Sequence, residues 1–212
     1  MRLPLSLMLI VIPVLGCAHK VMARKTNSVP CSNDAVAAVN APSQPVILSP
    51  IQGVRPNELR DSFNEMHNGH RHEAIDIMEP SGTPVRAVVS GTIRKLFLSK
   101  AGGITIYEFD ANYVYCYYYA HLGRYADDLH EGMRVYQGEV VGYVGSTGNA
   151  SPLAPHLHFA INRLGPQKRW WCGAPIDPYP VLERSLSEGV STSPASSARR
   201  IYLILEMLHA AA

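Results

Sequence analysis

The sequence predicts a mostly β, antiparallel domain, built as two packed sheets or a split barrel with a groove. Several segments are rich in β-branched and aromatic residues and are separated by Gly, Pro and Asn: PVRAVVSGTIRKLFLS, GGITIYEF, YVYCYYYAHL, GEVVGYVG and HLHFAINR. The chain also contains 16 Gly, 16 Pro and 11 Tyr, a composition that favours strands and turns over helices. Within the region of these segments, we expect at most one short helix, at residues 125–130.

The N-terminus is predicted to be an export signal. Arg2 precedes an apolar stretch over residues 3–15, which is too short to cross a bilayer comfortably. It ends in Val-Leu-Gly-Cys, which resembles the lipobox of bacterial lipoproteins. The resemblance implies removal of residues 1–16, a lipid on Cys17 and, because Ala18 is not Asp, sorting to the periplasmic face of the outer membrane. An ordinary secretory signal is the alternative.

The remaining organisation follows from composition. Residues 17–45 are polar and small, as in a flexible tether between the anchor and the domain. Residues 46–182 contain the strand segments and form the folded domain. Residues 183–212 begin as a Ser-rich linker and end in IYLILEMLHAAA, an apolar tail too short to cross a bilayer. Its docking onto the domain, a partner or a membrane surface is left open.

Charge and cysteine content exclude several classes of function. The formal net charge of +2 is too small to indicate nucleic-acid binding or strong electrostatic attachment to a membrane. Cys31, Cys116 and Cys172 allow one disulfide at most, in any of three pairings. No C-x-x-C spacing is present, which argues against a thiolate metal site.

The segment PHLHFAI places two histidines in an otherwise apolar strand. Side chains alternate between the faces of a strand, so Leu157, Phe159 and Ile161 point one way. His156 and His158 then share the other face. By itself H-x-H is compatible with two hydrogen-bonded surface histidines, so further residues are needed to indicate chemistry.

A second candidate is the H-x-x-x-D spacing of His72 and Asp76. In a fully extended strand four residues cover roughly 13 Å, too far for both side chains to reach one metal ion. A bend near Glu73 and Ala74 would bring the imidazole and the carboxylate together. His67 and His70 are rival candidates, but neither has an acidic residue four positions later.

The segment YVYCYYYAHL supplies a third histidine. Simple alternation predicts that Tyr115, Tyr117, Tyr119 and His121 share one face, an aromatic but hydrated surface typical of a binding groove. A tyrosine-rich sheet surface with an incidental histidine is the alternative.

Together these residues indicate a catalytic Zn²⁺ site. His72, Asp76 and His158 would supply three nitrogen or oxygen ligands and leave the fourth position open, as catalytic zinc sites do. His121 and His156 would remain as non-ligands, available as general base and as a group that stabilises the transition state.

The ordered blocks HEAID, GTPVRAVVSGTI, YYAHL, GYVGSTGN and PHLHF resemble the lysostaphin/LytM-type zinc metallopeptidases, which cut peptide cross-links in bacterial cell walls. The resemblance covers about residues 46–179. It implies that His72, Asp76 and His158 bind zinc and that His121 and His156 serve catalysis, without deciding which is the base. The family usually has Gly at the position of Ala74, where a bend could require a positive φ.

The resemblance implies a peptidoglycan endopeptidase that uses a metal-activated water, with the cross-link peptides as substrate and an N-terminal lipid holding the chain at the membrane. No nucleic-acid partner is expected. The alternative comes from relatives that have lost zinc ligands and act as non-catalytic activators of cell-wall amidases. This chain keeps all five polar positions, which favours the enzyme. Trp170 and Trp171 are expected to close the domain against its core, with a groove wall as the alternative.

Overall fold

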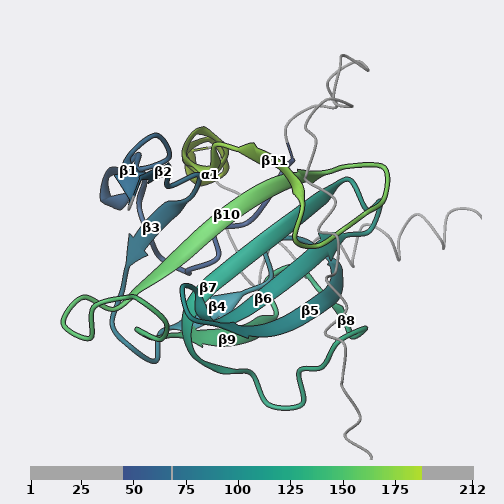
Figure 1. The fold of residues 1–212 in the computed structure, drawn as a ribbon, viewed down its shortest axis with the longest axis horizontal. Coiled ribbons are helices and arrows are strands. Elements are labelled where there is room, and N and C mark those ends of the chain that lie inside the picture. The colour runs from purple at the N-terminus through teal and green to yellow at the C-terminus, as the bar shows by residue number, and fades with distance from the viewer. Residues whose placement is uncertain (1–44, 68, 188–212) are drawn as a thin grey trace, which may run out of the picture. The chain divides into compact units, whose positions relative to one another are not determined.

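The computed structural model describes residues 45–67 and 69–187, a mostly antiparallel β domain (Figure 1). Its elements are η2 (Pro56–Glu58), β1 (Met66–His67), β2 (His70–Arg71), β3 (Ile75–Met78), β4 (Pro84–Arg86), β5 (Gly91–Ser99), β6 (Gly103–Asp110), β7 (Tyr115–Tyr125), β8 (Arg134–Val135), β9 (Val140–Val144), β10 (His156–Leu164), β11 (Gly173–Ile176) and α1 (Pro178–Ser187). The predicted fold class, mostly β and antiparallel, is confirmed.

One nine-stranded sheet contains every described strand except the β1–β2 hairpin. Its main path runs β11-β10-β7-β6-β5-β8, while β3 pairs with β10 and β9 pairs with both β7 and β4. In Figure 1, β10, β7, β6 and β5 lie side by side, with β3 continuing along one edge of β10. The described strands do not close into a barrel. Strand β10 therefore lies between β3 and β7, and these three strands carry most of the candidate residues.

The main core lies under one face of the sheet. Leu157, Phe159 and Ile161 of β10 are fully buried there, together with Tyr117 and Tyr119 of β7. Each such side chain contributes roughly 1.5–3 kcal/mol by leaving water. The alternation predicted for PHLHFAI is confirmed, and the core holds β10 with its histidines on the opposite face.

The prediction of a short helix at residues 125–130 is wrong: β7 continues to Tyr125, and turns follow it. The helix present is α1, which begins at Pro178 and packs Val181 and Leu182 into the core. Two residues at the start of α1 favour a helix there. Asp177 caps it, since Oδ1 accepts a hydrogen bond from the Tyr179 amide at 2.9 Å, and Pro178 suits the first helical position. The helix runs to Ser187, past residue 182 where the domain was expected to end.

The face of β7 changes at His121. Between the pairs Ile104–Leu122 and Ile106–Tyr119, β7 has one residue more than β6, which is a β-bulge. His121 has a φ of +59°. The prediction that His121 shares a groove face with Tyr115, Tyr117 and Tyr119 is therefore wrong. Those tyrosines belong to the core, whereas His121 lies on the face of His158.

A second, smaller cluster lies on the other face of the sheet. It consists of the buried Phe109, Cys116 and Leu164, with Tyr107 and Trp170 packed against them. The rings of Trp170 and Tyr107 are 4.6 Å apart between centroids, so Trp170 packs here and not on the main core. Cys116 is a free buried thiol whose pKa is raised by burial, whereas Cys172 is disulfide-bonded. Pairings that involve Cys116 are therefore excluded.

In the described part of the chain, no helix combines the length and the apolar character needed to span a bilayer. The predictions for the signal segment, the lipid on Cys17, nearly all of the tether and the apolar tail fall on residues 1–44 and 188–212, outside the described residues.

Glu108 on β6 is a carboxyl group enclosed in the protein interior. Its exposed fraction is 0%, and Oε2 accepts a hydrogen bond from the Tyr119 hydroxyl at 2.5 Å. Among the described residues Oε1 has no hydrogen-bond partner. Burial raises the pKa of Glu108 to about 8 from an ordinary value of 4.5. The folded state therefore keeps the carboxyl protonated at neutral pH, while the unfolded chain releases the proton.

The contribution of Glu108 to stability should be fully present below pH 4.5 and be lost as pH rises toward 8. A difference of one bound proton changes the free energy of unfolding by about 1.4 kcal/mol per pH unit. Glu108→Gln should flatten this dependence while keeping an acceptor for Tyr119. Urea unfolding at pH 5 and pH 8 measures the pH dependence of the free energy of unfolding, with Glu183→Gln, a substitution of an exposed residue, as control. If the free energy of unfolding changed equally with pH in the wild type and in Glu108→Gln, a buried neutral carboxyl would be excluded.

Candidate metal centre

Two of the candidate ligands come from neighbouring strands. In the register of β3 and β10, Asp76 lies directly opposite His158, and His158 is also paired with Ala120 of β7. Ile75 and Ile77 are buried on either side of Asp76. Alternation therefore turns the carboxylate to the face that carries the β10 histidines, as the sequence predicts.

His72 precedes β3 and reaches the same point through a bend. Glu73 has a φ of +53°, and the backbone bends at Ala74, between His72 and Asp76. The predicted bend near Glu73 is present, but the positive φ falls on Glu73, and Ala74 adopts a negative φ and is fully buried. Alanine in place of the family's glycine thus creates no strain at position 74.

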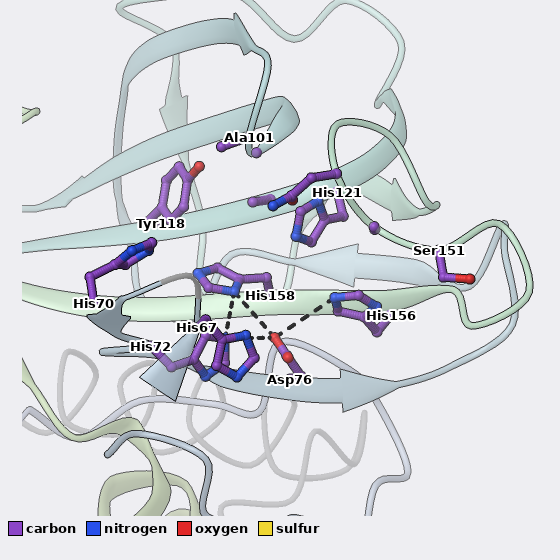
Figure 2. A pocket seen from close by; sticks show the side chains of 14 residues that line it. His67, His70, His72, Asp76, Ala101, Tyr118, His121, Ser151, His156 and His158 are labelled. Atoms are coloured by element: carbon purple, nitrogen blue, oxygen red, sulfur yellow. Dashed lines mark hydrogen bonds and ion pairs between the residues drawn. The ribbon is translucent and has the colours of Figure 1, made fainter. Parts of the chain in front are cut away.

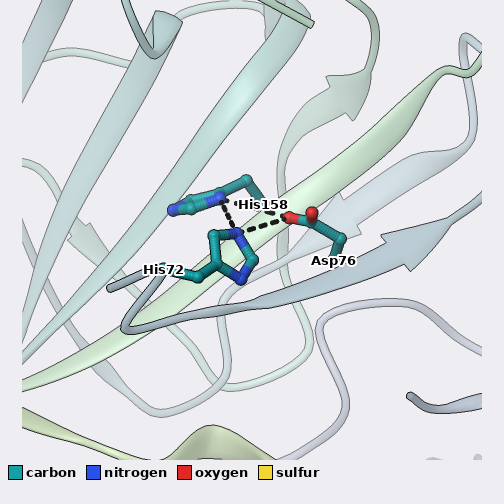
Figure 3. A group of neighbouring side chains, drawn as sticks. All are labelled: His72, Asp76 and His158. Atoms are coloured by element: carbon teal, nitrogen blue, oxygen red, sulfur yellow. Dashed lines mark hydrogen bonds and ion pairs between the residues drawn. The ribbon is translucent and has the colours of Figure 1, made fainter. Parts of the chain in front are cut away.

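His72, Asp76 and His158 form a compact triangle of ligand atoms (Figure 3). His72 Nε2 lies 3.0 Å from His158 Nδ1, and Asp76 Oδ1 lies 3.2 Å from each of these nitrogens. Atoms bound tetrahedrally to zinc at 2.0–2.1 Å are separated by about 3.3 Å. The triangle therefore matches one face of a zinc tetrahedron, and the donor set fits this metal.

Among residues 45–67 and 69–187, this is the one group of three or more His, Cys, Asp or Glu side chains whose ligand atoms lie within 4.8 Å of one another. His67 and His70 do not join it, although both line the adjoining pocket. The ring of His67 stacks on that of His72 with centroids 4.4 Å apart. The rivals considered from sequence are therefore neighbours of the cluster.

The orientation of His72 is determined by Ser62. His72 Nδ1 lies 3.2 Å from both the carbonyl oxygen and the hydroxyl of this buried serine. The carbonyl can only accept, so Nδ1 is the donor nitrogen and Nε2 presents its lone pair to the cluster. This is the arrangement by which ligand histidines are normally oriented in metal sites.

The electrostatics of the cluster favour an ionised carboxylate. Burial raises the pKa of Asp76, but its close contacts with the imidazole rings of His158 and His72 outweigh burial and hold that pKa well below its usual range. Burial lowers the pKa of His158. Burial also lowers the pKa of His72, but the combined effects of Asp76, the Ser62 backbone and Glu65 outweigh it, so that the pKa of His72 is raised. An anionic oxygen beside two imidazole nitrogens is a ligand set suited to a divalent cation.

His121 and His156 lie beside the triangle without belonging to it (Figure 2). Their ring centroids are 4.9 Å apart, and His121 is 5.6 Å from His158. His121 Nδ1 donates to the Thr147 carbonyl at 2.8 Å, and His156 Nδ1 donates to the Ala154 carbonyl at 2.9 Å. Because carbonyls only accept, Nε2 is the unprotonated nitrogen in both neutral rings.

Both rings are thus able to accept a proton at Nε2. His156 Nε2 lies 3.8 Å from Asp76 Oδ1, next to the ligand triangle. Burial lowers the pKa of His121 to about 4, with the nearby His158 and His156 acting in the same direction. The His121 ring is therefore neutral at physiological pH, with the lone pair of Nε2 available to accept a hydrogen bond or a proton.

The five side chains open into a pocket of about 480 Å³, a size typical of ligand sites. The sequence interpretation missed the part of its lining formed by Ala101, Gly102, Tyr118, Ala120 and Ser151. Tyr118 and Ala120 were missed because alternation placed them opposite His121. The GYVGSTGN block was a usable signal for the lining near Asn149, since it was one of the motifs that carried the resemblance.

Several known peptidases are similar to this chain. The model of Peptidase family M23 matches residues 70–178, about half of the chain, a range that includes the ligand triangle, His121 and His156. An L-Ala–D-Glu endopeptidase of Bacillus subtilis is 34% identical over 116 residues, 52% of this chain and 34% of the relative. The DD-carboxypeptidase/endopeptidase Mpg of Neisseria meningitidis is 41% identical over 118 residues, 55% of this chain and 24% of the relative. The match thus spans about a third of the first relative and about a quarter of the second.

Among solved structures, the catalytic domain of the antimicrobial peptidase lysostaphin from Staphylococcus simulans is similar. The two have a TM-score of 0.50 and 30% sequence identity, and the match covers 60% of this chain and 95% of that domain.

Proposed function

Because the chain belongs to peptidase family M23, we propose that it is a zinc-dependent endopeptidase that hydrolyses peptide cross-links of bacterial peptidoglycan. The observation that carries the proposal is the ligand triangle of His72, Asp76 and His158, with two further histidines beside it whose Nε2 atoms are unprotonated. A structural zinc site would use a fourth protein ligand, whereas three ligands and an adjoining pocket suit catalysis.

In this proposal His72 Nε2, Asp76 Oδ1 and His158 Nδ1 hold the metal. Zn²⁺ bound there would polarise the scissile carbonyl and lower the pKa of the attacking water. Asp76 neutralises part of the charge, while Ser62 keeps the His72 ring in its binding orientation.

His121 and His156 carry the proton transfers. Each holds its Nδ1 proton on a backbone carbonyl, which leaves Nε2 to accept the proton of the attacking water or, once protonated, to donate to the leaving amine. A protonated or hydrogen-bonded imidazole also stabilises the oxyanion of the tetrahedral intermediate. The two rings are in T-shaped contact, with centroids 4.9 Å apart, so either can serve as the base and the other as the stabilising group.

The substrate assignment rests on the relatives and on the sequence. Both curated relatives described above are named as endopeptidases, and one of them acts on DD bonds by its name. With the lipid anchor inferred on Cys17 and a tether reaching the wall, this favours the D-Ala to diaminopimelate cross-link over glycine bridges. We place the protein in the cell envelope, at the periplasmic face of the outer membrane.

Digestion of purified cross-linked peptidoglycan by the full chain tests this function. We expect release of uncross-linked stem peptides, loss of that activity after treatment with a chelator, and its recovery when about one equivalent of Zn²⁺ is returned. If the zinc-loaded chain cuts nothing but stimulates a cell-wall amidase, the hydrolase proposal is wrong and the domain is an activator.

A further inference from the structure

Two segments far apart in the sequence meet beside His121. One is the turn between β5 and β6, residues 99–103, and the other is the loop that follows β9, residues 145–149. The Asn149 amide donates to the Ala101 carbonyl at 2.9 Å, and the His121 amide donates to the Gly102 carbonyl at 2.8 Å. The backbone of His121 is therefore attached to the first segment, and its ring to the second through Thr147.

The hydroxyl of Thr147 makes two hydrogen bonds to the backbone of β6 and β7 at the bulge. It accepts from the Ile104 amide at 2.9 Å and donates to the Leu122 carbonyl at 2.7 Å. Ile104 and Leu122 are partners in the register of β6 and β7, directly next to the extra residue in β7. The threonine side chain thus bridges two backbone groups of the strands that hold the bulged His121.

The two segments can approach this closely because two glycines lie at the crossing. A Cβ atom on Gly103 would lie 2.1 Å from Thr147 Oγ1, and one on Gly148 would lie 2.2 Å from the Ala101 carbonyl oxygen. Both glycines also have positive φ values, of +65° and +77°. Backbone contact at this point is thus incompatible with larger residues.

We propose that Thr147 is a positioning residue for His121, with its hydroxyl joining β6 and β7 at the bulge and its carbonyl orienting the imidazole. The hydroxyl holds Thr147 in place, and the carbonyl of the same residue accepts the Nδ1 proton of His121. Loss of the hydroxyl leaves two backbone groups unpaired and allows the carbonyl to shift, so the Nε2 lone pair no longer points steadily into the pocket.

The same loop also reaches the other proposed catalytic histidine. The His156 amide donates to the Gly145 carbonyl at 3.3 Å, and a Cβ atom on Gly145 would lie 2.3 Å from the Gly123 amide nitrogen. Residues 145–149 therefore connect the backbones next to His121 and His156. A displaced loop would alter the distance between the two rings without touching the ligand triangle.

This inference rests on the proposed function, and a pair of substitutions in the full chain tests it. Thr147→Val keeps the shape of the side chain and removes the hydroxyl, whereas Thr147→Ser keeps the hydroxyl. For Thr147→Val we expect kcat to fall about 10- to 100-fold, as for a misplaced catalytic group, with KM and the zinc content unchanged. Thr147→Ser should restore most of kcat. A loss shared equally by both variants, or a loss of zinc, would overturn the proposal.

A nuclear magnetic resonance readout makes the test independent of hydrolysis. In the wild type the His121 Nδ1 proton, held by the Thr147 carbonyl, should exchange slowly with water, and the Ile104 amide should be protected. Both should exchange faster in Thr147→Val and remain protected in Thr147→Ser. Unchanged exchange in Thr147→Val excludes the positioning role, whether or not the chain cuts peptidoglycan. Failure of the wild type to hydrolyse its substrate, with these exchange differences present, contradicts the proposed function alone.

A backbone variant provides a second, independent test. Gly103→Ala should displace Thr147, because the methyl group added at position 103 has no room beside Thr147. The variant should lower kcat as Thr147→Val does. Gly132→Ala is the matched control, because Gly132 has a φ of +86° but nothing within 4 Å of its added methyl. Equal effects on kcat in the two glycine variants would show backbone strain in general and not displacement of Thr147.

Discussion

His158→Ala is expected to abolish both zinc binding and hydrolysis of peptidoglycan. The substitution removes one corner of a triangle whose atoms are 3.0–3.2 Å apart, and two ligands are too few to retain zinc. Loss of an outer-shell partner typically costs 10- to 100-fold in metal affinity, so loss of a direct ligand should cost more than about 100-fold. Zinc content after dialysis and release of stem peptides are the two measurements.

The control for this substitution is His130→Ala. His130 is exposed, lies outside the pocket and contacts the Asp128 carbonyl through Nδ1. It should keep about one zinc per chain and full activity. Thermal unfolding of both metal-free variants separates loss of a ligand from loss of the fold. Stoichiometric zinc in a folded His158→Ala chain would show that the metal, if any, binds elsewhere.

His156→Ala and His121→Ala are expected to have the opposite combination: zinc is retained and hydrolysis is lost. Neither ring belongs to the ligand triangle, yet both line the pocket and hold Nδ1 on a backbone carbonyl, which leaves Nε2 unprotonated. Removal of a group that transfers protons in the transition state typically costs about 10²- to 10⁴-fold in rate, so kcat should fall by this amount with little change in KM. The double variant should lose little more than the worse single variant, because the two groups act in one step.

The measurements are zinc content, kcat and KM for the two single variants and the double variant. Loss of zinc in either single variant would mean that its histidine is a ligand. A rate within about threefold of the wild type, far from the loss expected for a general base, would remove that histidine from the proton transfers.

Sequence alone could predict the features that depend on local periodicity. Period-two alternation placed His156 and His158 on one face of a strand, and the structure has Leu157, Phe159 and Ile161 buried beneath them. The same rule turned Asp76 away from Ile75 and Ile77. The distance argument also required a bend between His72 and Asp76, and Glu73 provides it. These properties follow from neighbouring residues along the chain.

Only the tertiary structure determined where His121 points and what orients it. Alternation along YVYCYYYAHL gave the wrong face, because an extra residue in β7 relative to β6 interrupts the period. A bulge is a property of two paired strands, so it is not visible in one of them. The contact of Thr147 with His121 joins residues 26 positions apart and depends on two glycines at a backbone crossing. Periodicity reports which face a side chain takes within one strand, whereas the pairing of strands and the packing of loops determine which residues meet.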